Sequence, residues 1–381
     1  MITSLTVVLI VFFLFKEGIG VFNKKPIEDG YVVTINKNNP VKNISSESIK
    51  DIYDQKITYW NQLGGTPDSI ILFRLEDISN YYTDEQIGEN FEGLANCINR
   101  LVDSLPNIIA FFPEKYLAPD FNGHNLNISK ITLSEFLIGK EWFPTAQPVA
   151  QLGVMPLILG TLWVSLGAIL IALPLGLAAA IFMSEIAKDK VRNIMKPLIE
   201  LLAGIPSVVY GFFGLVVIVP LIQKTFDLPV GETGLAGSII LAIMALPTII
   251  TISEDAMRNT PRAVKEASLA LGASKWQTIY KVVIPYSVSG ISAGAILGIG
   301  RAIGETMAVL MVTGNAAVIP HTILAPVRTI PATIAAELGE APNGGLHYKA
   351  LFALGCILFI ITLFINLTVG FISNKKKHNN H

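Results

Sequence analysis

Six long apolar runs, separated by more polar segments, dominate the pattern of hydrophobic and polar positions along this chain. Each run is about 20 residues or longer, the length that a helix needs to cross roughly 30 Å of hydrocarbon. Soluble proteins of ordinary composition do not carry such a series of runs. The pattern therefore predicts an all-α polytopic membrane protein with six transmembrane helices, at residues 2–22, 153–183, 198–222, 234–254, 286–312 and 350–372.

Composition supports this prediction and shows where the chain leaves the membrane. Hydrophobic residues make up 51% of the 381 residues, and charged residues make up only 15%. Residues 24–141 nevertheless contain 28 of the 57 charged side chains, which is typical of a water-exposed domain. We therefore predict a first transmembrane helix (1–22), an insert (23–145), a core with five transmembrane helices (146–373) and a tail (374–381).

The insert alternates strand and helix patterns in the way that is typical of an α/β lobe. Within residues 31–79, a strand pattern precedes a helix that Ser45 or Ser46 can cap. A turn at Gly64-Gly65 and a second strand pattern follow. The apolar run in PNIIAFFPEKYL, residues 106–117, predicts a further buried strand.

Basic residues indicate the orientation of the spans. Residues 185–196 carry four Lys or Arg, residues 254–281 carry five, and Lys375, Lys376 and Lys377 follow the last span. By the positive-inside rule these segments are cytoplasmic, which places the insert outside. No small-residue cleavage site of the A-x-A kind follows the first run, so we expect that run to be retained as a helix.

Glycines mark one face of the fifth run. Gly290, Gly294 and Gly298 recur every four residues and form a smooth strip on which a neighbouring helix can pack closely.

In the third run, Pro206 and Ser207 interrupt the apolar sequence. This interruption could open backbone groups toward a cavity or could be only a packing kink.

Two charged residues, Arg301 and Glu305, continue the face of the glycine strip in GIGRAIGETMAVLMVTGN, residues 298–315. We expect both charges to point into the bundle near mid-membrane, where an arginine costs at least ~2.5 kcal/mol. An intrahelical i,i+4 pair is the alternative, but the order with the base N-terminal to the acid is the less favourable one. The planar fork of a guanidinium matches the oxygens of phosphate-like anions. We therefore favour a substrate pathway in which Arg301 contacts a translocated anion and Glu305 tunes that contact.

The loop between the fourth and fifth spans, residues 254–285, has a distinctive spacing. Glu266, Ala267 and Gly272 stand at the first, second and seventh positions of a pattern that ends at Pro285. The spacing predicts a short amphipathic helix, a glycine that breaks it, and a second helix that the proline stops before the membrane. An ordinary helical hairpin is the alternative.

This loop resembles the EAA loop of ABC-importer permeases, although Ser268 stands where that family usually has Ala. The resemblance extends strongly over residues 139–315, and the ending GETMAVLMVTGN favours the phosphate-specific permease family of the PstC type over its paralogous partner permease. It implies a MetI-like permease fold and a transmembrane subunit of an ATP-driven phosphate importer in the bacterial inner membrane.

The resemblance also implies partners. Glu266, Ala267 and Gly272 would couple the chain to a dimer of ATP-hydrolysing subunits, and a second homologous permease would complete the pathway. Because the chain lacks a G-x-x-x-x-G-K-[ST] phosphate loop, ATP is expected on the partner, with no cofactor and no metal ion in this chain. An extracytoplasmic phosphate-binding protein, phosphate and membrane lipid are further expected partners. The net charge of −1 argues against nucleic acid as a partner. The sequence also offers no catalytic nucleophile beside a general base, so we do not expect an enzyme.

The insert itself resembles part of the phosphate-binding protein PstS, most clearly in ISSESIKDIYDQKITYWNQLGG. Those receptors grip phosphate with an arginine followed closely by Ser-Gly-Thr, whereas Arg74 is followed by Leu75, Glu76 and Asp77. We therefore expect a scaffold or docking lobe rather than an independent phosphate site. Two alternatives remain open for the chain: a membrane-bound phosphate sensor or receptor, and a permease for another oxyanion such as sulfate or molybdate.

Overall fold

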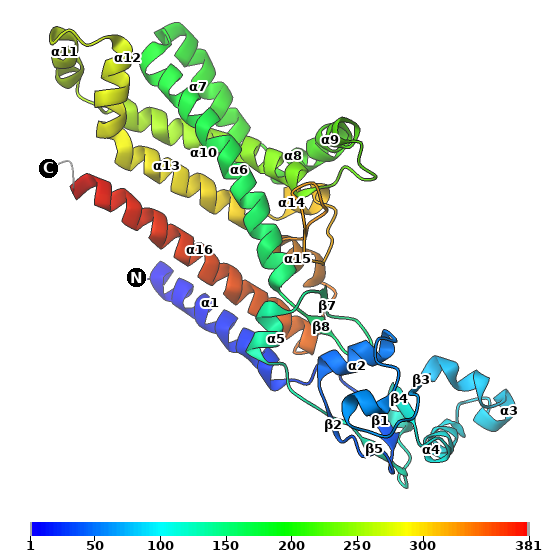
Figure 1. Ribbon diagram of the computed structural model, residues 1–381. Helices are drawn as coiled ribbons and strands as arrows, with labels where there is room; N and C mark the ends of the chain where they lie inside the picture. The colour runs from blue at the N-terminus through cyan, green and yellow to red at the C-terminus, as the bar shows by residue number, and fades with distance from the viewer. Residues whose placement is uncertain (1, 379–381) are drawn as a thin grey trace. The chain divides into compact units, whose positions relative to one another are not determined.

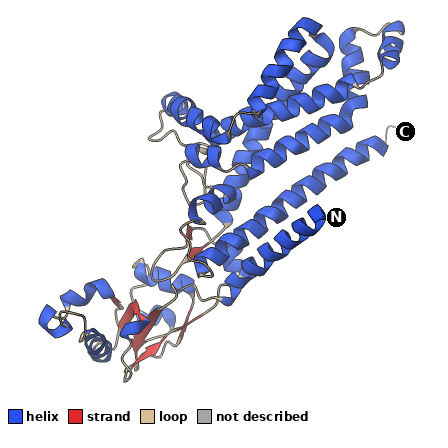
Figure 2. Cartoon of the chain, turned by 180° about the vertical axis from the view of Figure 1, so that it is seen from behind, coloured by secondary structure: helices blue, strands red, loops and turns tan. Residues whose placement is uncertain are grey.

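The structure is a computed structural model that describes residues 2–378, with side chains described for residues 5–368. The chain divides into two compact units. The N-terminal unit comprises Met1–Gly153 and Ala341–Ala353, and the helical unit comprises Val154–Glu340 and Leu354–His381. Every strand in the described residues belongs to the N-terminal unit, and helices build the other (Figure 2).

The N-terminal unit joins a long apolar helix, α1 (Ile2–Ile19), to an α/β lobe. The main sheet of the lobe has the strand order β3-β4-β1-β5, in which β3 and β4 are parallel and β1 is antiparallel to both β4 and β5. These strands are β1 (Tyr31–Asn36), β3 (Ile71–Arg74), β4 (Ile108–Pro113) and β5 (Gly123–Asn125). The other elements are η1 (Gly20–Asn23), β2 (Asn43–Ile44), α2 (Ser46–Tyr53), η2 (Trp60–Leu63), η3 (Leu75–Asn80), α3 (Asp84–Ile87), α4 (Leu94–Ser104), η4 (Glu114–Tyr116), β6 (Asn127–Ile128), α5 (Leu133–Ile138), β7 (Trp142–Phe143) and β8 (Gln151–Leu152).

Both faces of the main sheet are covered, which explains the uninterrupted apolar run in β4. Ile109 and Phe111 belong to a cluster with Ile49 and Ile52 of α2. Phe112, which points to the opposite face, belongs to a cluster with residues of α4. The lobe therefore has an α/β core on each side of one sheet.

The local signals in the insert are confirmed. Ser45 caps α2, since its Oγ accepts a hydrogen bond from the backbone N–H of Ser48 at 3.1 Å. Gly64 ends η2 with a φ of +79°, a conformation that L side chains rarely adopt. The predicted strand, capped helix, glycine turn and strand thus occur in the expected order.

The helical unit is built around α10 (Gly234–Arg258). In its apolar stretch 61% of the residues are buried, against 28% or less in each of the other apolar spans, so α10 is the central helix. Two long helices, α6 (Met155–Ile181) and α13 (Ile284–Gly304), pack along it (Figure 1). The remaining elements are the π-helical turns η5 (Phe182–Ile186), η6 (Gly214–Ile218) and η7 (Ile279–Val283), and α7 (Asp189–Ala203), α8 (Ser207–Phe213), α9 (Val219–Phe226), α11 (Arg262–Ala270), α12 (Lys275–Thr278), α14 (Met307–Val312) and α15 (Ile330–Glu337). The last helix, α16 (Leu346–His378), has residues in both units.

Six helical stretches in the described residues are long and apolar enough to cross a membrane, which confirms the predicted number. They are Leu5–Asn23, Met155–Ile186, Ser207–Phe226, Gly234–Arg258, Lys275–Gly304 and Leu346–Thr368. Four of them agree with the predicted spans to within a few residues. The third and the fifth do not.

The predicted third span, residues 198–222, begins in the wrong place. Residues 198–203 belong to α7, a separate helix that exposes apolar side chains such as Ile194 and Leu201. The next helix, α8, begins only after Pro206. Proline has no N–H to donate and disfavours the helical conformation for Ile205 before it, so the chain breaks there.

The predicted fifth span, residues 286–312, is wrong at both ends. It starts earlier, because α12, η7 and α13 form one helical stretch, Lys275–Gly304. Pro285 does not stop the second helix of the loop, since it lies in the first turn of α13, where proline is well tolerated. The span also ends earlier, at Gly304, and α14 starts only at Met307.

Candidate functional site

Arg301 and Glu305 stand on opposite sides of a break in the helix. Arg301 lies in the last turn of α13, whereas Glu305 follows the helix end in an extended conformation with a ψ of 135°. The Glu305 carboxylate accepts a hydrogen bond from the backbone N–H of Thr306 at 3.1 Å. The expectation that both charges share one continuous helix face is therefore wrong, and the intrahelical i,i+4 pair is not formed.

Arg301 is partly buried and has no ion-pair partner in the part of the chain that the structure describes. No carboxylate oxygen of the described residues lies within 4.0 Å of its guanidinium. Its charge instead interacts with the hydroxyl group of Tyr210 in α8. Tyr210 is buried, and its hydroxyl donates to the backbone carbonyl of Leu202 at 2.8 Å. Sequence reasoning missed Tyr210, although a lone tyrosine after the Pro206 interruption was a signal.

The short helix after the break is firmly packed. Ala308, Val309 and Val312 of α14 are buried. A methyl group placed on Gly211 of α8 would lie 2.7 Å from the Sδ of Met311, so α8 and α14 approach closely. Irregular backbone at membrane depth is tolerated only where it is covered by protein or lines a water-filled cavity. The packed α14 therefore makes the break a fixed feature of the bundle.

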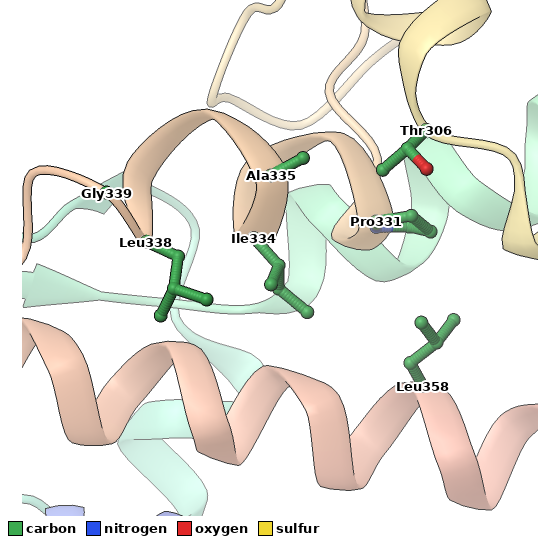
Figure 3. Close-up of a pocket in the computed structure, with 7 residues that line it drawn as sticks. All are labelled: Thr306, Pro331, Ile334, Ala335, Leu338, Gly339 and Leu358. Carbon is green, nitrogen blue, oxygen red and sulfur yellow. The ribbon is translucent and has the colours of Figure 1, made fainter.

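An apolar pocket of about 520 Å³ adjoins the break within the helical unit (Figure 3). Its lining residues are Thr306, Pro331, Ile334, Ala335, Leu338, Gly339 and Leu358. Figure 3 shows Ile334 and Leu338 of the α15 segment pointing toward α16, from which Leu358 points toward α15. Thr306 contributes the one polar side chain of this lining, so the pocket does not offer the donors that an oxyanion needs.

The glycine strip places α13 directly against α10. A methyl group placed on Gly298 would lie 2.7 Å from Cγ1 of Ile249, and one placed on Gly290 would overlap the Cβ of Ala256. Gly294, between them, is buried. The helix that carries Arg301 is thus held at close range by the central helix of the unit.

The loop between α10 and α13 presents its predicted coupling residues on the surface. Glu266 and Ala267 are exposed, and α11 contains no buried residue. Gly272 has a φ of +83°, and no atom lies within 4 Å of the position that a methyl group would take there. Glycine is therefore required by the backbone conformation after α11 rather than by lack of space.

Large apolar side chains are exposed along the same loop. We define the coupling face as Val264, Leu269, Leu271, Trp276 and Tyr280. Leu271 is 89% exposed, Tyr280 is 73% exposed and Trp276 is 66% exposed. Exposed apolar groups of this size, beside polar residues, mark sites of contact with a protein or a membrane.

Two sets of ion pairs join helices near this loop. Lys265 of α11 donates to Oε1 of Glu185 in the π-helical turn η5 at 2.6 Å. Lys196 of α7 donates to Asp255 at 2.7 Å and to the fully buried Glu254 at 2.8 Å. Hydrogen bonds to Asp255 and Glu254 raise the pKa of Lys196 above its usual value. Sequence reasoning missed these pairs, because a count of basic residues does not say which acid each one meets.

Arg74 of the lobe lacks the surroundings of an anion grip. Its backbone N–H donates to Oδ2 of Asp77 at 2.9 Å, and its guanidinium lies 5.2 Å from the centre of the Tyr53 ring. The segment that follows is the short 3₁₀ helix η3, with Glu76 and Asp77 in its first turn. These carboxylates disfavour a bound anion beside Arg74.

Comparison with known protein families assigns both parts of the chain. A family described as "Binding-protein-dependent transport system inner membrane component" matches residues 172–378. A second family, described as "PBP superfamily domain", matches residues 15–114. The first match covers the helices that carry the glycine strip, Arg301 and the coupling face.

Curated relatives extend this similarity. The probable ABC transporter permease protein YqgH of Bacillus subtilis is 40% identical over 250 residues, which cover 66% of this chain and 81% of YqgH. The phosphate transport system permease protein PstC of Mesorhizobium japonicum is 41% identical over 249 residues, which cover 60% of this chain and 75% of that protein. Among solved structures, the inward-facing MetNI methionine ABC transporter matches with 19% identity and a TM-score of 0.44, over 59% of this chain and 94% of that chain.

Proposed function

The chain belongs to the family of binding-protein-dependent transport system inner membrane components, and on that premise we propose that it is the transmembrane permease subunit of an ATP-driven phosphate importer. Relatives named as phosphate transport permeases support phosphate as the substrate. The observation that carries the proposal is Arg301, whose guanidinium meets no carboxylate within 4.0 Å among the described residues of a membrane-spanning unit.

An unpaired guanidinium suits a site that binds an anion only briefly. Inserting an arginine into a membrane-spanning helix costs at least ~2.5 kcal/mol, and ionisable residues kept at such positions mark substrate and ion pathways. The planar fork of Arg301 forms two parallel hydrogen bonds to phosphate oxygens. Tyr210 of α8 is fixed by the hydrogen bond that its hydroxyl donates to the Leu202 carbonyl at 2.8 Å. Glu305, which follows the helix break, tunes this contact through its negative charge.

The energy for transport comes from a partner. Glu266, Ala267 and Gly272, with the coupling face around them, dock on a dimer of ATP-hydrolysing subunits, and ATP is bound there rather than by this chain. A second homologous permease completes the pathway. This arrangement places the α11 end of the helical unit in the cytoplasm and the insert outside the bacterial inner membrane.

The insert serves as a scaffold or as a docking surface for an extracytoplasmic phosphate-binding protein. Its similarity to the PBP superfamily supports a role on the receptor side of transport. The acidic residues after Arg74 speak against independent phosphate binding by the lobe.

Uptake of radiolabelled phosphate tests the proposal directly. Cells that lack this chain should take up little phosphate at low external concentration, and supplying the chain should restore uptake. An excess of unlabelled sulfate or molybdate should leave the restored uptake unchanged. Competition by either of these anions would reassign the substrate, and uptake that is the same with and without the chain would contradict the proposal.

A further inference from the structure

The coupling helix α11, which carries Val264 and Leu269 of the coupling face, contacts mainly α12 and η7 of its own loop. None of the nine residues of α11 is buried, so apolar packing does not anchor it. Within the loop, Ser268 Oγ lies 3.0 Å from Thr278 Oγ1, which ties α11 to α12. Among the hydrogen bonds and ion pairs of the described residues, the pair between Lys265 and Glu185 links α11 to η5, outside the loop.

This ion pair is short and largely shielded from water. The Lys265 Nζ and the Glu185 Oε1 lie 2.6 Å apart, and their side chains are only 21% and 12% exposed. Glu185 lies in η5, the π-helical turn that follows α6 without interruption. Such π-helical turns are frequent at functional sites, and this one places a carboxylate beside the coupling helix.

The pair therefore gives the coupling helix a second connection to the bundle. Chain continuity through α12 and η7 already links α11 to α13, which carries Arg301. The Lys265–Glu185 pair links α11 to the end of α6, a helix that also contacts α13 along the bundle. Figure 1 shows α11, α12 and the adjoining end of α13 at one end of the unit, with α6 and α13 both running beside α10.

We propose that the Lys265–Glu185 ion pair transmits the movement of the coupling helix to α6, so that α6 and α13 move together when the ATP-hydrolysing partner moves α11. This inference rests on the proposed function. Lys265 and Glu185 are positioning residues in it, since neither contacts the transported anion. A permease that lacks the pair still binds its partner but couples ATP hydrolysis to transport poorly.

The test uses the assembled complex in proteoliposomes, with phosphate uptake measured per ATP hydrolysed. Glu185→Gln and Lys265→Gln should each lower that ratio by at least about fivefold, which is the low end of typical coupling between sites. The charge exchange, Glu185→Lys with Lys265→Glu, should restore most of it. The matched control is Asp189→Asn, which removes an ion pair with Arg192 inside the single helix α7 and should leave the ratio unchanged.

Two results would overturn the inference. One is an unchanged ratio of uptake to hydrolysis in both single variants, and the other is a charge exchange that performs no better than either single variant. If the pair had a purely structural role, its loss would lower the amount of assembled complex. The assembled complex would then show the wild-type ratio of phosphate uptake to ATP hydrolysis.

A spectroscopic measurement separates this inference from the choice of substrate. Spin labels at Leu166 of α6 and Leu297 of α13, which are 60% and 56% exposed, report the distance between the two helices with and without ATP. The native cysteines Cys97 and Cys356 are buried. We expect an ATP-dependent change in the wild-type complex that Glu185→Gln abolishes. If that change occurs in a complex that takes up no phosphate, the proposed substrate is wrong and the ion-pair inference stands; if Glu185→Gln leaves the change intact, the inference fails.

Discussion

Replacing Gly290 with alanine should push α13 away from α10 and destabilise the helical unit. The new methyl group would overlap the Cβ of Ala256. Because both carbons are attached directly to the backbone, no side-chain rotation relieves the overlap, and the helices themselves must separate. Gly300→Ala in the same helix is the control, since a methyl group there meets no atom within 4 Å.

The expected magnitude follows from comparing the two variants. Alanine stabilises a helix relative to glycine by about 1 kcal/mol, and this gain applies equally at both positions. Overpacking in a close-packed interior costs about 1–3 kcal/mol, and it applies only at Gly290. At roughly 2–4 °C per kcal/mol for a unit of this size, Gly290→Ala should melt roughly 2–12 °C below Gly300→Ala.

The assay is thermal unfolding of the isolated chain in detergent, followed by the loss of folded protein on heating. The isolated chain is needed because a partner subunit could cover Gly300. If the two variants melted at the same temperature, close packing of α13 on α10 through the glycine strip would be refuted.

Three further variants test other parts of the structure. Gly272→Val should reduce co-purification of the ATP-hydrolysing partner more than Gly272→Asn, because asparagine tolerates the positive φ at this position better than a β-branched residue; equal losses would contradict the backbone explanation. Lys196→Met should destabilise the chain by about 1–3 kcal/mol, because the buried Glu254 carboxylate then keeps only its longer contact with Arg258, at 3.8 Å, and adding Glu254→Gln should recover part of the loss. Because hydrogen bonds to Asp255 and Glu254 raise the pKa of Lys196, the stability that its ion pairs contribute is fully present below the ordinary lysine pKa. The difference in melting temperature between wild type and Lys196→Met should therefore be equal at about pH 6 and about pH 8; a difference that grows over this range would contradict the raised pKa. Tyr210→Phe should cost about 0.5–1.5 kcal/mol by removing the hydrogen bond to the Leu202 carbonyl, and an unchanged melting temperature would show that this bond does not hold α7 and α8 together.

The number of spans and the layout of the insert could be predicted because both depend on signals within one segment. An apolar run of sufficient length predicts a membrane helix whatever it packs against. Ser45 and Gly64 act on their own backbone, so the cap and the turn in the insert also follow from the local sequence.

The break between Arg301 and Glu305 could not be predicted in this way. The segment GETMAV contains no proline, and its apolar residues suit a continuous helix as well as an interrupted one. The break is favoured by tertiary packing, since Ala308 and Val309 of α14 are buried among residues of other helices. The start of the third span was more accessible to prediction, because Pro206 marks the boundary between α7 and α8.

The partners of the charged side chains also depend on the folded arrangement. Lys265 and Glu185 are 80 positions apart in sequence, and Lys196 is separated from Glu254 by 58. The sequence shows that basic residues gather around the coupling loop, but the fold decides which of them is paired. The same holds for Arg301, whose lack of a carboxylate within 4.0 Å, among the residues described, became evident only in the structure.

The most direct test of the account is phosphate uptake per assembled complex in Arg301→Gln and Arg301→Lys. If Arg301 contacts the transported anion through its planar fork, Arg301→Gln should abolish uptake while the complex still assembles and hydrolyses ATP. Arg301→Lys should retain only a small fraction of uptake, because a single ammonium group cannot reproduce the two parallel hydrogen bonds. Wild-type uptake by Arg301→Gln in a normally assembled complex would contradict the account.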